Sequence, residues 1–254
     1  MTHPPARRRA APRIALALAC SALAALACAG AAPAPVTAGV SRVVLAPLNL
    51  GVRMPEGLED SEAPVWDALL GYLHAKDARV RLLDGEGAAA LWQEAAAEAL
   101  RSGAVLAPRA VEARFAAAVR EQVDYDLLVM PSIVRRSARI GGYSATWDGT
   151  RRRLPMRPRV PAELALSLAD DAGYRGSVAA ASLYVAILGP DGRALFEGLA
   201  GLDVVQELVR GKRARGEDPW RLEARSDAFD DAESLRAGVE RAFERPLPAT
   251  ARNW

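Results

Sequence analysis

Two long apolar runs joined by a short turn constrain the fold of this chain more than any other feature. They form the segment AASLYVAILGPDGRALFEGLAGLDVV, residues 180–205. The turn contains Pro190 and Asp191, which suit a type I turn, followed by Gly192, which can adopt a positive φ. Because both runs are apolar almost throughout, we expect an antiparallel hairpin whose two strands lie centrally in a sheet.

The rest of the chain supplies further strands and the helices that would cover the sheet. Apolar, β-branched runs predict strands over 41–50, 79–84 and 125–134. Apolar residues at helical spacing predict amphipathic helices over 62–77, 88–101 and 108–122. Asp230, with Glu233 three residues later, resembles a capping box and predicts the start of a last helix, which Pro246 ends.

This order of elements predicts an α/β (α+β) fold. We expect a mixed-sheet sandwich, in which helices pack on a sheet of about five strands and the C-terminal hairpin is antiparallel. A single domain over 42–245 would contain all of these elements, with 246–254 as a tail.

An arginine-rich excursion at 135–161 interrupts this pattern. Between residues 135 and 159, eight arginines stand against one acidic residue, Asp148. Guanidinium groups beside exposed aromatic rings suit an anionic envelope component or an acidic protein partner. The residues predicted to bind such a partner are Arg135, Arg136, Arg139, Tyr143, Trp147, Arg151, Arg152 and Arg153. The alternative is a solvated loop in a chain that uses arginine far more than lysine.

The N-terminal segment has the order of an export signal. Four arginines precede an apolar stretch from Ile14 to Ala27, which is too short to span a bilayer but suits a signal peptide over 1–27. Both cysteines of the chain, Cys20 and Cys28, follow the sequence ALA within this region.

The sequence ALAC at Cys28 resembles the lipobox of bacterial lipoproteins, in which the thiol receives diacylglycerol. The resemblance implies a lipid anchor at Cys28, an outer-membrane location facing the periplasm, and a flexible tether over 28–41. Ordinary signal-peptidase cleavage after Ala27 or Ala29 is the alternative and would give a soluble periplasmic protein.

The charge balance does not favour a nucleic-acid partner. Four of the 33 basic residues lie in 1–27 and the first acidic residue is Glu56. Removal of 1–27 therefore leaves 29 basic against 31 acidic residues, a net charge of −2.

Catalytic chemistry finds little support in the sequence. The two histidines, His3 and His74, cannot form a multi-histidine metal site, so we expect no metal, no cofactor and no catalytic residue. Gly85, Gly87 and Ala90 match G-x-G-x-x-A between a strand and a helix, which leaves open a periplasmic enzyme or nucleotide-binding protein. The alternative at this position is a plain glycine-rich turn.

Three strands carry a family resemblance. VVLAPL, YDLLVMPSIV and LYVAILGPDGRALFEG, in this order around the helices, are similar to strands of a small domain found in three groups of envelope proteins. These are the curli secretion channel lipoproteins, the lipoprotein activators of penicillin-binding proteins and the N-terminal domain of the Tol-Pal translocation protein. The resemblance implies a non-enzymatic, lipid-anchored protein that binds another envelope component for assembly, secretion or cell-wall regulation, and it leaves homo-oligomer formation open.

Overall fold

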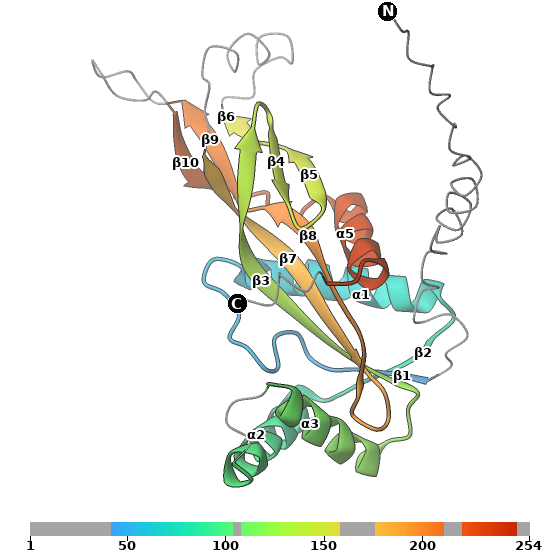
Figure 1. Ribbon diagram of the computed structural model, residues 1–254. Helices are drawn as coiled ribbons and strands as arrows, with labels where there is room; N and C mark the ends of the chain where they lie inside the picture. The colour runs from blue at the N-terminus through green and yellow to red at the C-terminus, as the bar shows by residue number, and fades with distance from the viewer. Residues whose placement is uncertain (1–41, 104–107, 158–175, 211–219, 248–254) are drawn as a thin grey trace, which may run out of the picture. The chain divides into compact units, whose positions relative to one another are not determined.

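The computed structural model describes residues 42–103, 108–157, 176–210 and 220–247, and it confirms the mixed α/β class (Figure 1). The first half of the chain contains β1 (Arg42–Leu45), the 3₁₀ helix η1 (Glu59–Ser61), α1 (Glu62–Ala75), β2 (Arg79–Leu82), α2 (Gly85–Arg101) and α3 (Pro108–Gln122). The second half contains β3 (Leu127–Gly141), β4 (Ser144–Trp147), β5 (Thr150–Arg153), β6 (Met156–Arg157), β7 (Ser177–Leu188), β8 (Ala194–Val204), β9 (Gln206–Arg210), β10 (Trp220–Ala224) and α5 (Ala232–Glu244).

The main sheet has seven strands arranged around the long strand β3. The first three residues of β3 pair in parallel with β1, which in turn pairs in parallel with β2. Its last three residues pair with β4, which pairs with β5, while β7 runs antiparallel to β3 along nearly its full length. A smaller sheet has the order β10-β9-β6. The main sheet exceeds the expected five strands because part of the arginine-rich excursion forms strands.

β3 also extends beyond the predicted strand, and its last residues pair with β4. Its first five residues are buried, and the burial then alternates along the strand to Gly141. Ala138 and Ile140 point to an apolar cluster, whereas Arg135 and Arg139 are exposed. This period-two alternation is typical of a strand with one buried face.

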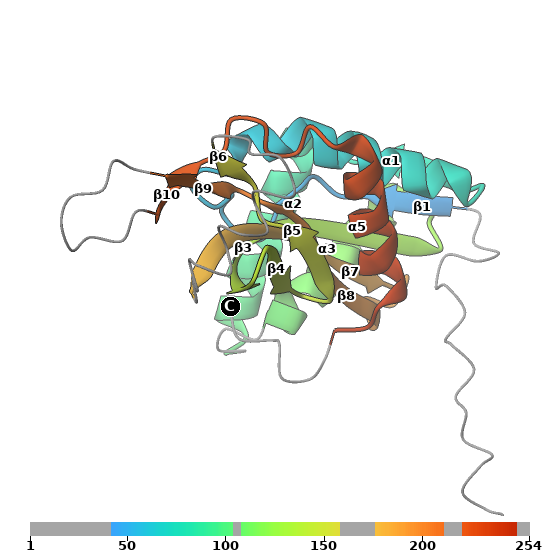
Figure 2. The same cartoon turned by 90° about the horizontal axis from the view of Figure 1, so that it is seen from above.

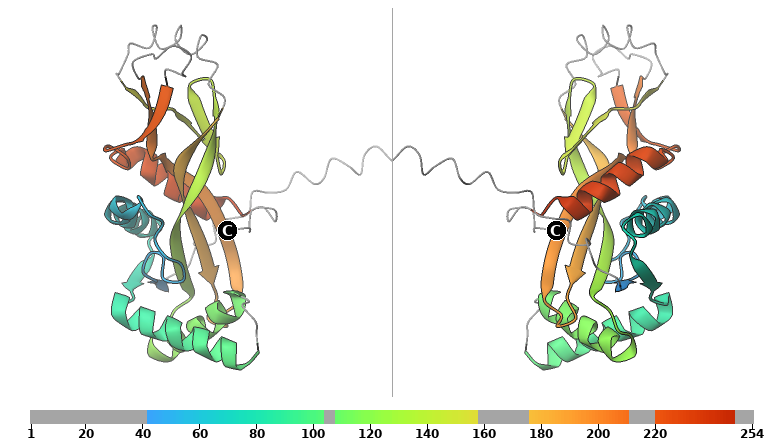
Figure 3. Two further views of the ribbon diagram at one scale, coloured as in Figure 1. Left: turned by 90° about the vertical axis from the view of Figure 1, so that its left-hand side faces the viewer. Right: turned by 90° about the vertical axis from the view of Figure 1, so that its right-hand side faces the viewer.

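Helices cover both faces of the sheet. Residues of α1 and α5 pack on the face that includes Val129 and Ile133, and residues of α2 and α3 pack on the face that includes Leu128 and Met130. Figure 2 shows α5 beside α1, and Figure 3 shows both helices on one side of the long strands, with α2 and α3 near the strands' lower end. The helices α2 and α3 cover only the lower part of their face.

The predicted hairpin is present as β7 and β8, but only β7 is central. It lies between β3 and β8, whereas among the described strands β8 pairs with β7 alone, apart from an isolated bridge between Gly198 and Pro246. Glycine lets α5 approach this outer strand closely, since a Cβ at Gly198 would lie 1.8 Å from the carbonyl oxygen of Ala242.

Aspartate caps define the starts of two helices. The carboxylate of Asp84 accepts a hydrogen bond from the backbone N–H of Gly87 at 2.8 Å, so α2 begins at Gly85. For α5 the prediction of Asp230 as the cap is wrong by one residue. Asp231 is the N-cap and accepts from the Ser234 N–H at 3.0 Å.

Candidate functional site

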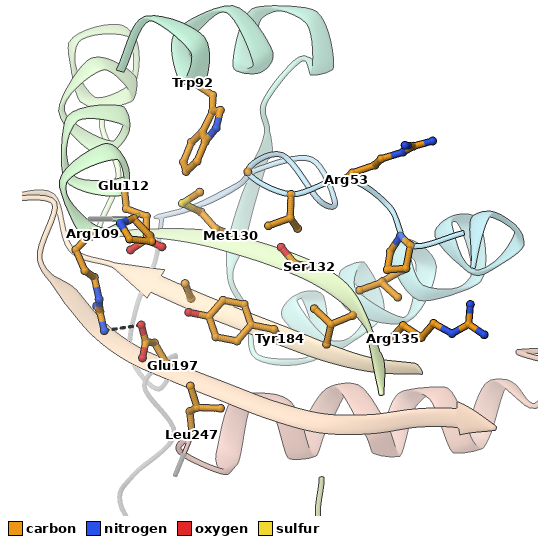
Figure 4. A pocket seen from close by; sticks show the side chains of 17 residues that line it. Arg53, Trp92, Arg109, Glu112, Met130, Ser132, Arg135, Tyr184, Glu197 and Leu247 are labelled. Atoms are coloured by element: carbon orange, nitrogen blue, oxygen red, sulfur yellow. Dashed lines mark ion pairs between the residues drawn. The ribbon is translucent and has the colours of Figure 1, made fainter. Parts of the chain in front are cut away.

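A cavity of about 760 Å³ lies over the part of the sheet face that α2 and α3 leave uncovered (Figure 4). Its floor comes from β3, β7 and β8, and its walls come from the loop after β1, from α2 and α3, and from the segment after α5. The lining residues are Gly51, Val52, Arg53, Pro55, Trp92, Pro108, Arg109, Glu112, Met130, Ser132, Ile133, Val134, Arg135, Tyr184, Ala186, Glu197 and Leu247.

The loop after β1 forms its wall because Asn49 fixes it to β3. The Asn49 side chain donates to the carbonyl of Ile133 at 2.9 Å and accepts from the Ile133 N–H at 2.8 Å, so it pairs like one residue of a strand. Asn49 itself has a φ of 56°, a left-handed conformation that Asn adopts more readily than most residues. Gly51 then lies against the Trp92 ring, where a Cβ would approach the ring to 2.7 Å.

The segment after α5 closes the opposite side. The Leu247 N–H donates to the backbone carbonyl of Glu197 at 2.7 Å, next to the bridge between Pro246 and Gly198. Backbone hydrogen bonds thus hold Leu247 at the edge of the cavity. Residues 248–254 of the predicted tail lie outside the described residues.

Four polar side chains gather at one end of this otherwise mainly apolar cavity. Arg109 Nη2 lies 2.5 Å from Glu197 Oε1, and the side chains of these residues are 44% and 10% exposed. Burial raises the pKa of Tyr184 far above its ordinary value, and the carboxylates of Glu197 and Glu112 and a hydrogen bond to Glu197 raise it further. The Tyr184 hydroxyl therefore stays protonated and is a hydrogen-bond donor.

Two further arginines lie at the other end. Figure 4 shows Arg53 and Arg135 away from the group of Arg109, Glu112, Tyr184 and Glu197. Both are exposed, and Arg135 donates to the carbonyl of Glu56 at 3.2 Å. Two unit charges 4 Å apart interact by about 4 kcal/mol at an effective dielectric constant of 20 but by about 1 kcal/mol in water. The partly buried polar groups thus act more strongly on a bound group than the exposed arginines do.

The predicted partner-binding residues do not form one exposed patch. Arg135, Arg139, Arg151 and Arg153 are exposed and Tyr143 is half-buried. Trp147 is only 5% exposed, and its Nε1–H donates to the Ala181 carbonyl at 3.1 Å.

Two of these arginines form ion pairs within the fold. Arg136 lies 2.9 Å from Asp148, which also accepts from the Ser182 hydroxyl at 2.7 Å. Arg152 is 3.5 Å from the buried Asp203, and both side chains are largely shielded from solvent. The arginine content of the excursion therefore reflects folding as well as surface charge.

At the glycine pair that starts α2, the N–H of Gly87 is engaged by the side chain of Asp84. Gly85 and Gly87 both lie in the first turn of the helix, and the Asp84 carboxylate occupies the place where a phosphate would approach. A phosphate there would meet a negative charge. Cys28 and residues 158–161 of the excursion lie outside the described residues.

Within 42–103, 108–157, 176–210 and 220–247, no three His, Cys, Asp or Glu side chains gather as a group that could hold a metal ion. In the same described part of the chain, no helix is both long and apolar enough to cross a membrane. Neither a protein-family model nor a curated protein matches the chain, so the family resemblance stays a prediction.

The cavity was not among the sequence-based site predictions. One local signal was available, because Glu197 interrupts an apolar strand between Phe196 and Gly198. A charged residue in such a strand is rarely buried without a partner. The sequence does not reveal that the partner is Arg109, which lies 88 positions away on α3.

Proposed function

We propose that this protein is a non-enzymatic, lipid-anchored envelope protein whose α/β domain binds another envelope component in the sheet-face cavity. The observation that carries the proposal is the cavity itself, with its volume of about 760 Å³, its mainly apolar lining and its cluster of polar groups at one end, most of them partly buried. Ligand pockets typically have volumes of about 300–1,000 Å³ and combine an apolar lining with a few polar groups that orient the ligand.

The chemistry of the polar end supports binding rather than catalysis. Glu197 is engaged by Arg109, and the raised pKa of Tyr184 makes its hydroxyl a donor and a poor general base. These groups can orient a ligand by hydrogen bonds and charge. The lipid anchor at Cys28 and the outer-membrane location rest on the N-terminal sequence.

A cavity-filling variant tests the proposal. The full chain with Cys28→Ser, which removes any acyl chain that could compete, is titrated with N-phenyl-1-naphthylamine, an apolar probe whose fluorescence rises in apolar sites. We expect binding to this chain and loss of binding after Ser132→Phe, because Ser132 lines the cavity.

Ser137→Phe is the matched control. It makes the same change on the same strand at an exposed position that does not line this cavity. Equal probe binding by the two variants would show that the cavity is not the binding site. A nucleotide series in a thermal-shift assay tests the alternative at Gly85 and Gly87, and we expect no shift because Asp84 caps that helix.

A further inference from the structure

We infer that the cavity takes a single-chain amphiphile whose anionic head group, a carboxylate or a phosphate ester, is bound by Arg53 and Arg135 at the exposed end. This inference rests on the proposed binding function and specifies the ligand class. It follows from the place of the two arginines beside an apolar lining, from their unused hydrogen-bond donors and from the ion pair that already engages Arg109.

One loop holds both arginines at the exposed end of the cavity. Arg53 belongs to the loop after β1, and Arg135 on β3 donates to the carbonyl oxygen of Glu56 in the same loop at 3.2 Å. Figure 4 shows both side chains at this end, away from Arg109 and Tyr184. Guanidinium groups pair well with the several oxygen atoms of a carboxylate or a phosphate, so this end of the cavity suits an anionic head group.

Most of the donors of these two arginines are available to a ligand. Within the described ranges neither side chain forms an ion pair, and Arg135 uses one N–H group for the Glu56 carbonyl. A guanidinium group carries five N–H donors and no acceptor. The Glu56 carboxylate is exposed and forms no ion pair with either arginine. The positive charge at this end is therefore not neutralised by a neighbouring carboxylate of the described chain.

The positive charge at the other end of the cavity is already paired. Arg109 Nη2 lies 2.5 Å from Glu197 Oε1. An anionic head group at that end would compete with the Glu197 carboxylate for the same guanidinium group. The head group therefore binds at the exposed end, and the apolar chain extends from there into the cavity.

The lining between the two ends suits such a chain. Side chains from α2, β3 and β7 form its apolar part, and these are Trp92, Met130, Val134 and Ala186. Val52, which precedes Arg53, also lines the cavity and is 45% exposed. A hydrocarbon chain that covers these side chains binds more tightly by about fourfold for each methylene group that it buries.

A matched series of ten-carbon amphiphiles tests the inference. Decanoate, decyl phosphate, decanol and decylamine share one apolar chain and differ in the head group. Each is titrated at pH 8 against N-phenyl-1-naphthylamine bound to the full chain carrying Cys28→Ser. We expect the stronger of the two anions to displace the probe at a concentration at least about fivefold lower than decanol, and decylamine to be the weakest of the four. The stronger anion identifies the head group.

Two paired variants locate the head group. Arg53→Gln with Arg135→Gln should abolish the preference for the anion over decanol and leave displacement by decanol unchanged, which also reports that the cavity remains folded. Arg139→Gln with Arg151→Gln is the matched control, because it removes the same charge at exposed positions that do not line this cavity. The control should retain the preference.

Two further measurements do not depend on the paired variant. Arg53→Gln alone removes no hydrogen bond or ion pair of the described residues and should lower the preference in part. Octanol, which is two methylene groups shorter than decanol, should need a roughly tenfold higher concentration to displace the probe.

The outcomes separate the two proposals. If decanol or decylamine displaces the probe as well as both anions do, selection by the arginines is wrong and the binding function stands. If the probe itself does not bind, the proposed binding function is wrong. The inference is also overturned if Arg53→Gln and the paired variant both keep the full preference, if the control loses it equally, or if octanol and decanol displace the probe equally well.

Discussion

Asp203 should be one of the side chains on which the stability of the domain depends most. Its side chain is 5% exposed and lies near two guanidinium groups, at 3.1 Å from Arg225 and 3.5 Å from Arg152. It also accepts hydrogen bonds from the backbone N–H groups of Val204, at 2.8 Å, and Phe229, at 3.0 Å. This cluster ties β5 and the segment before α5 to β8.

The substitution Asp203→Asn preserves the shape of the side chain and removes its charge. Arg152 and Arg225 then remain largely buried without their shared carboxylate; burial already lowers the pKa of Arg152, an effect that Asp203 opposes. Removal of one partner of a buried ion pair costs about 3–5 kcal/mol. We expect the free energy of unfolding to fall by about 3 kcal/mol, a large share of the roughly 5–15 kcal/mol typical of a domain.

Thermal and urea unfolding followed by circular dichroism measure this loss. For a domain of this size, 1 kcal/mol corresponds to about 2–4 °C, so the expected decrease in Tm is about 6–12 °C. Asp124→Asn is the matched control, because Asp124 is 74% exposed in its ion pair with Arg42 and should change stability by less than about 1 kcal/mol. Equal Tm values for the two variants would refute a stabilising role for the buried cluster.

Three further predictions concern the anchor, the arginine-rich excursion and a helix cap. Cys28→Ser should move the protein from the membrane pellet to the soluble fraction, and equal solubility of both forms would contradict lipidation. The double variant Arg151→Ala, Arg153→Ala should change the free energy of unfolding by less than about 0.5 kcal/mol, since both side chains are exposed. Its salt-sensitive capture of a partner from solubilised envelope should decrease. Unchanged capture would show that these arginines only face solvent. Hydrogen bonds from the Ser234 hydroxyl and backbone N–H lower the pKa of Asp231, so this cap stabilises the fold above the unfolded-state pKa and the effect is lost as the pH falls through the folded-state pKa. Asp231→Ala should therefore lower the free energy of unfolding, measured with urea, by about 1 kcal/mol at pH 7 and by much less in strong acid. Asp230→Ala is the control and should not produce this pH-dependent loss.

Local patterns in the sequence predicted most elements because each element has its own periodicity and boundary residues. Helix α3 extends over the predicted 108–122, with Pro108 in its first turn. The strand predicted over 41–50 ends instead at Leu45, because the following residues pair with β3 through Asn49 rather than through a regular ladder. That interaction joins residues 84 positions apart, and local sequence does not encode it.

The cavity escaped prediction for the same reason. Trp92, Glu112, Tyr184 and Glu197 come from four elements, and all but Glu197 have an ordinary local explanation as an apolar or surface residue of their helix or strand. Only the incomplete cover that α2 and α3 give to the sheet brings these side chains around one space. Residue type and spacing therefore predicted the layers of the fold, whereas the site depends on how much of the sheet face α2 and α3 leave uncovered.

The arginine-rich excursion and the cavity meet at Arg135. Arg135 belongs to the predicted partner-binding set and also lines the exposed end of the cavity. Arg152 and Trp147, from the same set, are held inside the fold by Asp203 and the Ala181 carbonyl. A component that enters the cavity from its exposed end would thus pass Arg135 before it reaches the partly buried polar groups at the other end, so the excursion contributes positive charge to this entrance. In this interpretation Arg135 influences the rate at which a charged component associates, and the partly buried polar groups influence how long it stays bound.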